Sequence, residues 1–437
     1  MVTRSQKLWC VVLGALFAFD VVDIYSFSYA APAITREWGL SLHSVGAVTS
    51  ATFLGMFFGG ITGGRISDRI GRKKTIIGAV MVYSLFSLTT TFANTVGFLV
   101  IARFLTGFGL QAMTGVLIVY VAEMFPRRSR GRYQSLLLAF GLVGVPIAAW
   151  LARLVIFLGP GMWRWVFVLG ALGALVGVAA IWLLPESVRW QSLHGDDYRA
   201  NVTVAKLEAQ AKAKTRAPLP APVEEPTVAS GRVGELLRGR NLRNFVVLCT
   251  GSVLIAFAFF GYNAYVPILL VDHGYTTSQT LLFASIFSIA AVPGALLAWP
   301  VVDRFERKLL IAGTTVVVGA LFVVFGVTGG SGMVLAAGFI ISMFLQTQTV
   351  FLYAYLPEMF PTHLRGVGSG IANGLGRLGV FAGGFIFAPL VAAAGFSGYF
   401  ITMAVILVIG GAVTGIFGMR STNRPLVENT SAANARS

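Results

Sequence analysis

Long apolar segments dominate this chain and restrict what it can fold into. Hydrophobic residues fill 56% of its 437 positions, whereas charged residues fill only 11%. About 20 consecutive apolar residues in a helix span the hydrocarbon core of a bilayer. The segments predict twelve membrane-spanning helices, six on each side of a central polar stretch, at 9–33, 43–64, 75–93, 97–119, 133–158, 163–184, 245–270, 280–301, 309–328, 332–356, 367–392 and 397–419.

A short signature occurs twice in the sequence, 235 residues apart. Residues 68–73 (DRIGRK) return as 303–308 (DRFERK), and residues 123–126 (EMFP) return unchanged as 358–361. Landmarks in constant register indicate two homologous halves, which is typical of membrane carriers whose halves move against each other.

The predicted fold is an all-α membrane protein with two pseudo-symmetric six-helix bundles. We expect an N-terminal bundle at 1–184, a cytoplasmic linker with a surface helix at 185–244, a C-terminal bundle at 245–420 and a disordered cytoplasmic tail at 421–437. The linker assignment rests on a Lys/Ala/Gln-rich stretch followed by four prolines around an acidic pair, at Pro218, Pro220, Pro222 and Pro226.

The positive charges lie almost entirely on one side of the predicted membrane. The net charge is +16, and if the N-terminus is cytoplasmic, 28 of the 33 Lys and Arg residues fall on cytoplasmic segments. This is the positive-inside distribution, and it predicts a multi-pass protein of the plasma membrane or bacterial inner membrane with both termini in the cytoplasm. A nucleic-acid-binding protein would instead need one basic face on a soluble module. The five basic residues that lie outside the predicted cytoplasmic segments are Arg36, Arg103, Arg153, Arg164 and Arg377.

The sequence contains no pattern that indicates enzymatic chemistry. Its four His residues have no metal-ligand spacing, and no nucleotide-binding loop or nucleophile–base motif is present. We therefore expect no enzyme activity, no metal site and no cofactor, with a proton as the coupling ion.

Three motifs resemble those of the major facilitator superfamily. Residues 64–74 (GRISDRIGRKK), between the second and third predicted helices, resemble its loop motif, and residues 103–109 (RFLTGFG) resemble its fourth-helix motif. Residues 185–190 (PESVRW) resemble the signature after the sixth helix in the sugar-porter and organic-acid branches. The resemblance covers essentially the whole chain. It implies an alternating-access transporter of a small molecule in the lipid bilayer, and we expect a monomer.

The loop motif implies a latch that controls the balance between inward-open and outward-open states. Asp68 is expected to pair with Arg72 or a neighbouring basic residue, and Asp303 is the counterpart of Asp68 in the second half. The alternative is that these charges only hold the loop on the cytoplasmic side.

A second pair of latches is predicted at the cytoplasmic ends of the fourth and tenth helices. Glu123 precedes Arg130 and Glu358 precedes Arg365 at the same spacing, which suggests matched ion pairs, Glu123 with Arg130 and Glu358 with Arg365. Their symmetry favours gating over substrate binding.

Four charged residues lie inside predicted spans, where each costs about 3 kcal/mol and needs a reason to be present. Asp20 and Asp23 are three residues apart on one helix and share a face, Arg103 lies on the fourth helix and Arg377 on the eleventh. Two neighbouring carboxylates in an apolar environment suit a proton-coupled carrier.

The preferred ion pair is Asp23 with Arg103, because these two residues have the more similar predicted depth. In this hypothesis protonation of Asp23 releases Arg103 and permits closure around the substrate; the alternative is a permanent structural salt bridge. The segment 20–23 (DVVD) resembles the paired-aspartate segment of the aromatic-acid:proton symporters, although two valines stand where those carriers place a glycine and an aromatic residue.

Arg377 has no charged counterpart in the first half of the chain. Its guanidinium suits a substrate carboxylate, and pairing with Asp20 or Asp23 is the alternative. Aromatic and amide side chains of other predicted spans complete a candidate substrate site: Tyr25, Tyr29, Gln111, Tyr262, Asn263, Tyr265, Gln346, Gln348, Tyr353 and Asn373.

The leading functional interpretation is proton-coupled uptake of a small organic acid, such as an aromatic or hydroxy carboxylate. A sugar or polyol:proton symporter is the nearest alternative, supported by Arg103, Asn263 and the signature at 185–190. A drug-efflux antiporter and a non-transporting membrane sensor are less favoured alternatives.

Overall fold

The computed structural model describes residues 2–126, 129–214, 233–237, 239–298, 300–302, 304–360 and 364–420. Within these ranges every regular element is a helix, and ten helices are long and apolar enough to cross a membrane. One of the ten, α16 (Arg365–Phe417), is 53 residues long and has non-helical dihedral angles at Gly395. It therefore contains the predicted span at 367–392 and the predicted span at 397–419 as far as Phe417. With the 19-residue helix α3 (Arg72–Thr90), these helices account for the twelve predicted spans.

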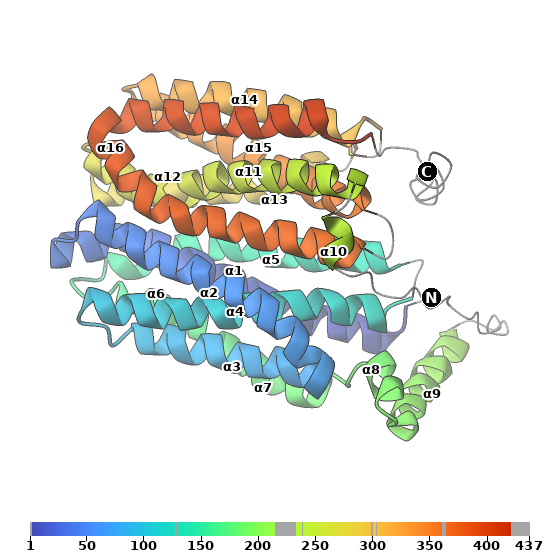
Figure 1. Ribbon diagram of the computed structural model, residues 1–437. Helices are drawn as coiled ribbons and strands as arrows, with labels where there is room; N and C mark the ends of the chain where they lie inside the picture. Colours follow the sequence, from blue (N-terminus) through green and yellow to red (C-terminus); the bar gives the residue numbers. More distant parts are fainter. Residues whose placement is uncertain are drawn as a thin grey trace. The chain divides into compact units, whose positions relative to one another are not determined.

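Residues 1–40 and 51–225 form one compact unit and residues 41–50 and 226–437 form a second. The helices of the first unit, shown in blue to green in Figure 1, are α1 (Arg4–Trp38), α2 (Leu42–Ile70) from residue 51 onward, α3, α4 (Val96–Met124), α5 (Arg130–Ile156), α6 (Arg164–Ala171) and α7 (Gly173–Leu183). The predicted span 163–184 is thus divided into α6 and α7 near Leu172, whose dihedral angles stay close to helical values.

Small residues allow close packing of α2 against α4. A Cβ atom added at Gly55 or Gly59 would lie 2.0 Å from the carbonyl oxygen of Phe104 or Phe108, respectively. Helices in lipid are held together by packing rather than by hydrophobic exclusion, so glycines at four-residue spacing permit this backbone contact. The Gly-x3-Gly pattern of α2 is therefore explained by helix packing.

Apolar side chains lie on the surface of the helices as well as in the core, unlike in a typical soluble protein. Large apolar side chains face outward, with Trp182 75% exposed and Ile101 63% exposed. Asp23 and Arg103 are both fully buried. This pattern is typical of a bundle whose surface contacts lipid and whose charged groups face the interior.

Two further helices of the first unit follow α7, namely α8 (Val188–Leu193) and α9 (Asp197–Lys214). Figure 1 shows them at the end of the unit where α3 begins and α7 ends. The helical part of the predicted linker corresponds to α9, and its Gln210 side chain bonds both the backbone N–H and the hydroxyl of Ser5, at 3.1 and 2.7 Å. The four linker prolines lie within residues 215–232, which are outside the described ranges. The predicted tail at 421–437 is also outside them.

The helices of the second unit are α10 (Val233–Leu236), α11 (Gly239–Asp272), α12 (Thr277–Ile289), α13 (Ala291–Ala298), α14 (Arg307–Val327), α15 (Ser331–Tyr355), the 3-10 helix η1 (Leu356–Met359) and α16. Its core is rich in aromatic rings: Phe325 packs edge-on against Phe400 with ring centroids 4.8 Å apart, and Tyr262 stacks on Phe322. These contacts join α11, α14 and α16.

Candidate functional site

The predicted ion pair between Asp23 and Arg103 is present and is completely buried. Nη1 of Arg103 lies 2.5 Å from Oδ1 of Asp23, and Nη2 donates to the Asp23 backbone oxygen at 3.1 Å. Both side chains have 0% exposure. The guanidinium also lies over the Phe167 ring of α6, with 5.7 Å between Cζ and the ring centroid. The pair therefore links α1, α4 and α6 in the interior of the first unit.

The position of the Asp23 carboxylate depends on a glycine of α6. A Cβ atom added at Gly170 would lie 2.3 Å from Oδ2 of Asp23 and 3.0 Å from the Ser87 hydroxyl of α3. That hydroxyl donates to the Phe167 carbonyl oxygen at 3.0 Å. A carboxylate can occupy this site only because residue 170 has no side chain.

Gly170→Ala is accordingly expected to disturb the ion pair without changing any charge. The new methyl group must displace the Asp23 carboxylate, and overpacking of this kind costs about 1–3 kcal/mol. We expect a lower melting temperature together with reduced transport. Gly115→Ala is the matched control, because a Cβ atom there meets open space and its helix propensity gains about 1 kcal/mol. Equal behaviour of the two variants would contradict the packing argument.

Asp20 lies one helical turn before Asp23 and is also buried, with 1% exposure. It acts electrostatically on the Tyr83 hydroxyl of α3, as does Asp23. The structure thus places both aspartates of α1 toward α3, as their shared helix face predicts. Of the two, Asp23 bonds Arg103, which agrees with the preferred pairing.

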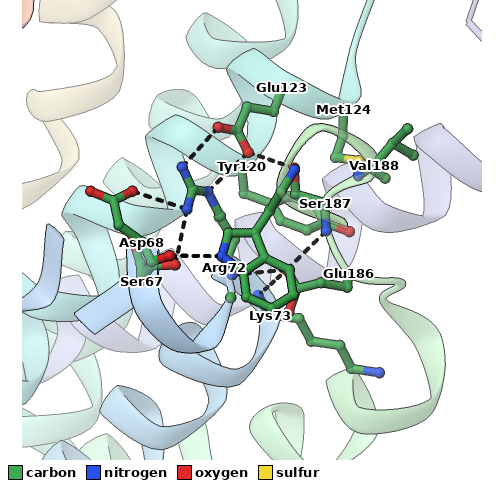
Figure 2. A network of polar contacts seen from close by, with 12 residues as sticks. Ser67, Asp68, Arg72, Lys73, Tyr120, Glu123, Met124, Glu186, Ser187 and Val188 are labelled. Carbon is green, nitrogen blue, oxygen red and sulfur yellow. Dashed lines mark hydrogen bonds and ion pairs between the residues drawn. The ribbon is translucent and has the colours of Figure 1, made fainter. Parts of the chain in front are cut away.

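A second polar cluster, here called the loop-motif cluster, lies at the end of the first unit that is predicted to be cytoplasmic. Arg72 donates to both carboxylate oxygens of Glu123, from Nε and Nη2, each at 3.0 Å. Its Nη1 pairs with Asp68 at 3.0 Å and bonds the Ser67 carbonyl oxygen at 2.9 Å. Figure 2 shows the guanidinium between the two carboxylates. The predicted Asp68–Arg72 pair is therefore present, whereas its gating role stays a prediction.

The predicted Glu123–Arg130 latch is wrong in its choice of partner. Glu123 is held by Arg72 and by the Ser187 hydroxyl, which donates at 2.5 Å, while Nε of Arg130 donates to the Phe125 carbonyl oxygen at 3.1 Å. Arg72 is favoured because it projects from the start of α3 directly beside the end of α4. Sequence proximity indicated Arg130, but the fold brings together residues 51 positions apart.

Residues of the 185–190 signature complete the loop-motif cluster, although the sequence did not mark them individually as site residues. One oxygen of Glu186 accepts backbone N–H bonds from Arg72, Lys73 and Ser187, at 2.8 to 2.9 Å. The carboxylate thereby caps the first turn of α3, where negative charge is stabilising. Nε1 of Trp190 donates to the Asp68 carbonyl oxygen at 2.9 Å. The signal that identifies these residues in the sequence is the 185–190 signature itself, which contains all of them.

The second unit repeats part of the loop-motif cluster. Arg307, the register equivalent of Arg72, bonds Glu358, the equivalent of Glu123. Lys308 donates to the Gly418 carbonyl oxygen at 3.0 Å. The predicted latch residue Asp303 and the side chain of Arg365 lie outside the described residues.

The predicted substrate residues of the second unit fall into two groups. Arg377 of α16 is half-buried, with its Cζ 5.4 Å from the centroid of the Phe260 ring. Asn373 lies one turn before it on α16, and Asn263 is half-buried on α11. These positions, with the half-buried Gln346 and Tyr353 (45% exposed) of α15, keep side-chain surface that a ligand can contact.

Three other residues of that set are almost completely buried. Tyr262 is 2% exposed, and its hydroxyl donates to the Gly338 carbonyl oxygen at 3.0 Å, so its role in the substrate site stays a prediction. Tyr265 is 1% exposed and packs edge-on against Phe387. Gln348 is also 1% exposed, yet neither its oxygen nor its nitrogen has a hydrogen-bond partner within the described part of the chain.

In the first unit the predicted aromatic residues of α1 lie together. Tyr25 and Tyr29 stack with ring centroids 6.1 Å apart, the former half-buried and the latter buried. Gln111 is half-buried on α4, where its side chain lies against Gly60 of α2. All three therefore stay candidates for substrate contact.

A polar cluster that sequence reasoning did not identify holds the far end of α1. Glu37 accepts from the backbone N–H of Gly161 and from Nε1 of Trp163, both at 2.9 Å, and pairs with Arg164 at 3.3 Å. Arg164 in turn lies over the Trp163 ring, 4.3 Å from its centroid. This arrangement accounts for Arg164, one of the basic residues outside the predicted cytoplasmic segments, as a structural clamp between α1 and α6.

The sequence matches the family described as the Major Facilitator Superfamily over residues 11–384, with a second match over 248–435. It is 38% identical over 414 residues to the putative metabolite transport protein YyaJ of Bacillus subtilis, covering 94% of this chain and 90% of that protein. It is 29% identical to the niacin transporter NiaP of Acinetobacter baylyi, covering 96% and 94%. It is 28% identical to the gallate transporter of Pseudomonas putida, covering 88% and 85%.

The fold is similar to that of a solved transporter structure. The xylose transporter XylE from E. coli, in a partially occluded inward open conformation, superposes with a TM-score of 0.74 at 19% identity, covering 96% of this chain and 99% of that one. At this identity the likeness shows the fold alone.

Proposed function

The chain belongs to the major facilitator superfamily of membrane transporters, and within that family we propose that it takes up a small organic acid together with a proton. It is thus a multi-pass membrane transporter of a small molecule and not an enzyme. The observation that carries the proposal is the fully buried Asp23–Arg103 ion pair. The proposed coupling ion, substrate class and direction go beyond family membership.

Proton coupling is supported by the burial of this pair. Two charges removed from water are held mainly by each other, because desolvation costs several kcal/mol per ion. Protonation of Asp23 cancels the attraction and leaves Arg103 as an uncompensated charge. A single proton thereby changes the force between α1 and α4 by an amount large enough to favour a different arrangement of these helices.

A carboxylate substrate is supported by Arg377 and by the relatives. The Arg377 guanidinium stacks near Phe260, and a planar fork of N–H donors beside an aromatic ring suits an aromatic acid. Niacin and gallate, the compounds in the names of two relatives, are both aromatic carboxylic acids. A sugar is less well supported, because the likeness to the xylose transporter is at the level of the fold.

The orientation and assembly belong to the same proposal. We place both termini in the cytoplasm, since the basic residues of the loop-motif cluster and of α9 lie on segments that the positive-inside rule assigns there. We propose that the transporter acts as a monomer.

The proposal is tested by uptake into proteoliposomes under separate driving forces. A monoanion that moves with one proton crosses without net charge, so a pH difference drives accumulation at about 1.36 kcal/mol per unit. Voltage alone, worth about 2.3 kcal/mol per 100 mV for each charge moved, should then have no effect. The screen comprises nicotinate, gallate, benzoate, hydroxy acids, xylose and glucose. Voltage-driven uptake of a sugar would replace the organic-acid proposal by the sugar alternative.

Arg377→Ala is expected to weaken binding of a carboxylate substrate by 10- to 100-fold, since a charge-assisted hydrogen bond contributes about 1.5–3 kcal/mol. Arg377→Lys should recover only part of this, because lysine keeps the charge but not the fork. The measurement is the half-saturation concentration of uptake. Arg153→Ala is the control, since this half-buried arginine stacks on Trp150 of its own helix. Unchanged affinity in Arg377→Ala would exclude Arg377 as the carboxylate ligand.

A further inference from the structure

Tyr83 of α3 is a fully buried tyrosine whose hydroxyl lies close to the ion pair of α1 and α4. Its side chain has 0% exposure, and its hydroxyl is acted on electrostatically by Asp20 and Asp23. Glycines surround it on two sides. A Cβ atom added at Gly173 of α7 would lie 2.1 Å from the Tyr83 hydroxyl oxygen, and one at Gly109 of α4 would lie 2.8 Å from the Tyr83 Cβ. Helices α4 and α7 therefore pack closely against this side chain.

Several buried polar atoms in this region have no hydrogen bond of normal geometry within the described residues, among them Nε of Arg103 and the Ser84 hydroxyl. Two others are Oδ2 of Asp23 and the hydroxyl of Tyr83. Both belong to side chains with 0% exposure. The adjacent Ser84 side chain lies within reach of the Tyr83 hydroxyl and can hydrogen-bond it, although not with normal geometry. Leaving such a group unsatisfied costs about 1–3 kcal/mol, so each unpartnered atom in a native interior needs an explanation.

The two atoms face the same stretch of one helical segment. Asp23 Oδ2 lies against Gly170 and the Tyr83 hydroxyl against Gly173. Residues three apart on a helix are neighbours, with about 5–6 Å between their Cβ positions. Two polar atoms beneath such neighbours lie within reach of one bridging water, and a polar buried site of this kind is where internal waters are found.

We propose that Tyr83 is a positioning residue for the proton that Asp23 carries, with its hydroxyl joined to Oδ2 of Asp23 through one water held beneath Gly170 and Gly173. This inference rests on the proposed proton coupling. When Asp23 is ionised, the Tyr83 hydroxyl donates toward the carboxylate through the water. When a proton binds, the new O–H bond forms at Oδ2, and the water and hydroxyl reverse their donor and acceptor roles. The Tyr83 O–H bond stays intact throughout.

The geometry assigns this role to Oδ2 because Oδ1 is already occupied by Arg103. Within the described residues, the charged groups that act on Tyr83 are the Asp20 and Asp23 carboxylates of α1, and Arg103 of α4 is bonded to Asp23. Helices α6 and α7 present glycines here, and the single charged residue in their sequences, Arg164, stands at the first position of α6. The proton at Asp23 is thus controlled by one cation on one oxygen and one hydroxyl on the other.

Tyr83→Phe tests the proposal, because it removes the hydroxyl and keeps the ring. Loss of a hydrogen bond to the charged form favours the protonated carboxyl. We expect the midpoint of the pH dependence of uptake to move upward by about 1 pH unit. Tyr399→Phe is the matched control: Tyr399 is also fully buried, and its hydroxyl donates to the Gly261 carbonyl oxygen at 3.0 Å. This control should lower the melting temperature and leave the pH midpoint unchanged.

A second variant acts on the same hydroxyl without removing it. Gly173→Ala should displace the Tyr83 hydroxyl and move the pH midpoint in the same direction. The double variant Tyr83→Phe/Gly173→Ala should then show no more shift than Tyr83→Phe alone, because both changes act through one group.

A Tyr83→Phe protein with an unchanged pH midpoint would overturn the inference, whatever its melting temperature, since a purely structural role predicts that result. A failure of the proposed function would give a different result. If transport is not coupled to a proton on Asp23, the Asp23→Asn variant itself will retain pH-driven accumulation, and Tyr83 will have no coupling proton to position.

Discussion

Asp23→Asn is expected to abolish pH-driven accumulation of substrate. A carrier coupled to one proton concentrates a monoanion about tenfold per pH unit; the variant should reach only an internal-to-external ratio of about 1. The reason is that asparagine can still accept a hydrogen bond from Arg103, but it can neither carry a negative charge nor bind the proton. The change that protonation normally produces in the pair is therefore permanently present.

The same variant separates coupling from folding, because exchange of labelled for unlabelled substrate requires no net proton movement. We expect exchange to remain measurable in Asp23→Asn. Removal of one partner from a buried pair costs about 3–5 kcal/mol, so the melting temperature should also fall. Asp196→Asn is the control, since Asp196 pairs with Arg199 at the surface at 3.5 Å, where such a pair contributes about 0–1 kcal/mol. Retention of full accumulation by Asp23→Asn would make the pair a permanent structural salt bridge.

Arg72→Ala is expected to have the second-largest effect, through loss of the loop-motif cluster. Arg72 alone joins Glu123, Asp68 and the Ser67 carbonyl oxygen. The side chains of Arg72 and Glu123 are only 11% and 10% exposed, so Glu123 would keep a largely buried charge with Ser187 as its remaining described partner. We expect destabilisation of about 3 kcal/mol, measured as thermal unfolding in detergent, together with slower transport.

A graded series makes the role of this arginine specific. Arg72→Lys keeps the charge but loses the two-pronged contact with Glu123, so it should lie between Arg72→Ala and the parent protein. Arg69→Ala removes an exposed arginine from the same loop and should behave like the parent. If Arg72→Ala unfolds at the same temperature as Arg69→Ala, the cluster contributes nothing to stability, and its charges serve only to orient the loop.

The features predicted best from the sequence are those that follow from placing the chain in a lipid bilayer. A charged side chain in a long apolar segment must find a partner in the interior, and this requirement led directly to Asp23 and Arg103. The i, i+4 pair of Asp68 and Arg72 was equally accessible, because both residues lie on adjacent turns of the chain. The register of 235 residues relates the Arg307–Glu358 pair to the Arg72–Glu123 pair, but the sequence predicts Arg365, and not Arg307, as the partner of Glu358.

The errors concern contacts between residues far apart in the sequence. Glu123 was assigned to Arg130, seven positions away, whereas α4 ends beside the start of α3 and its carboxylate bonds Arg72. For Tyr262, a predicted substrate residue, the sequence likewise does not indicate that its hydroxyl donates to a carbonyl of α15. In both cases the residue type indicated a polar contact, but the sequence did not indicate the partner. The periodicity of a helix does not reveal which other helix it faces.

The sequence by itself determined the membrane-spanning architecture, its duplication and the small set of buried charges, because a bilayer excludes any other arrangement of long apolar segments. Only the tertiary structure decided the partners: Arg103 on one oxygen of Asp23, Glu186 at the start of α3, and glycines 170 and 173 over the carboxylate and the Tyr83 hydroxyl. These contacts depend on distances of a few ångströms between helices. Such distances follow from how small residues allow the helices to pack, and a single sequence records the glycines without recording what they face.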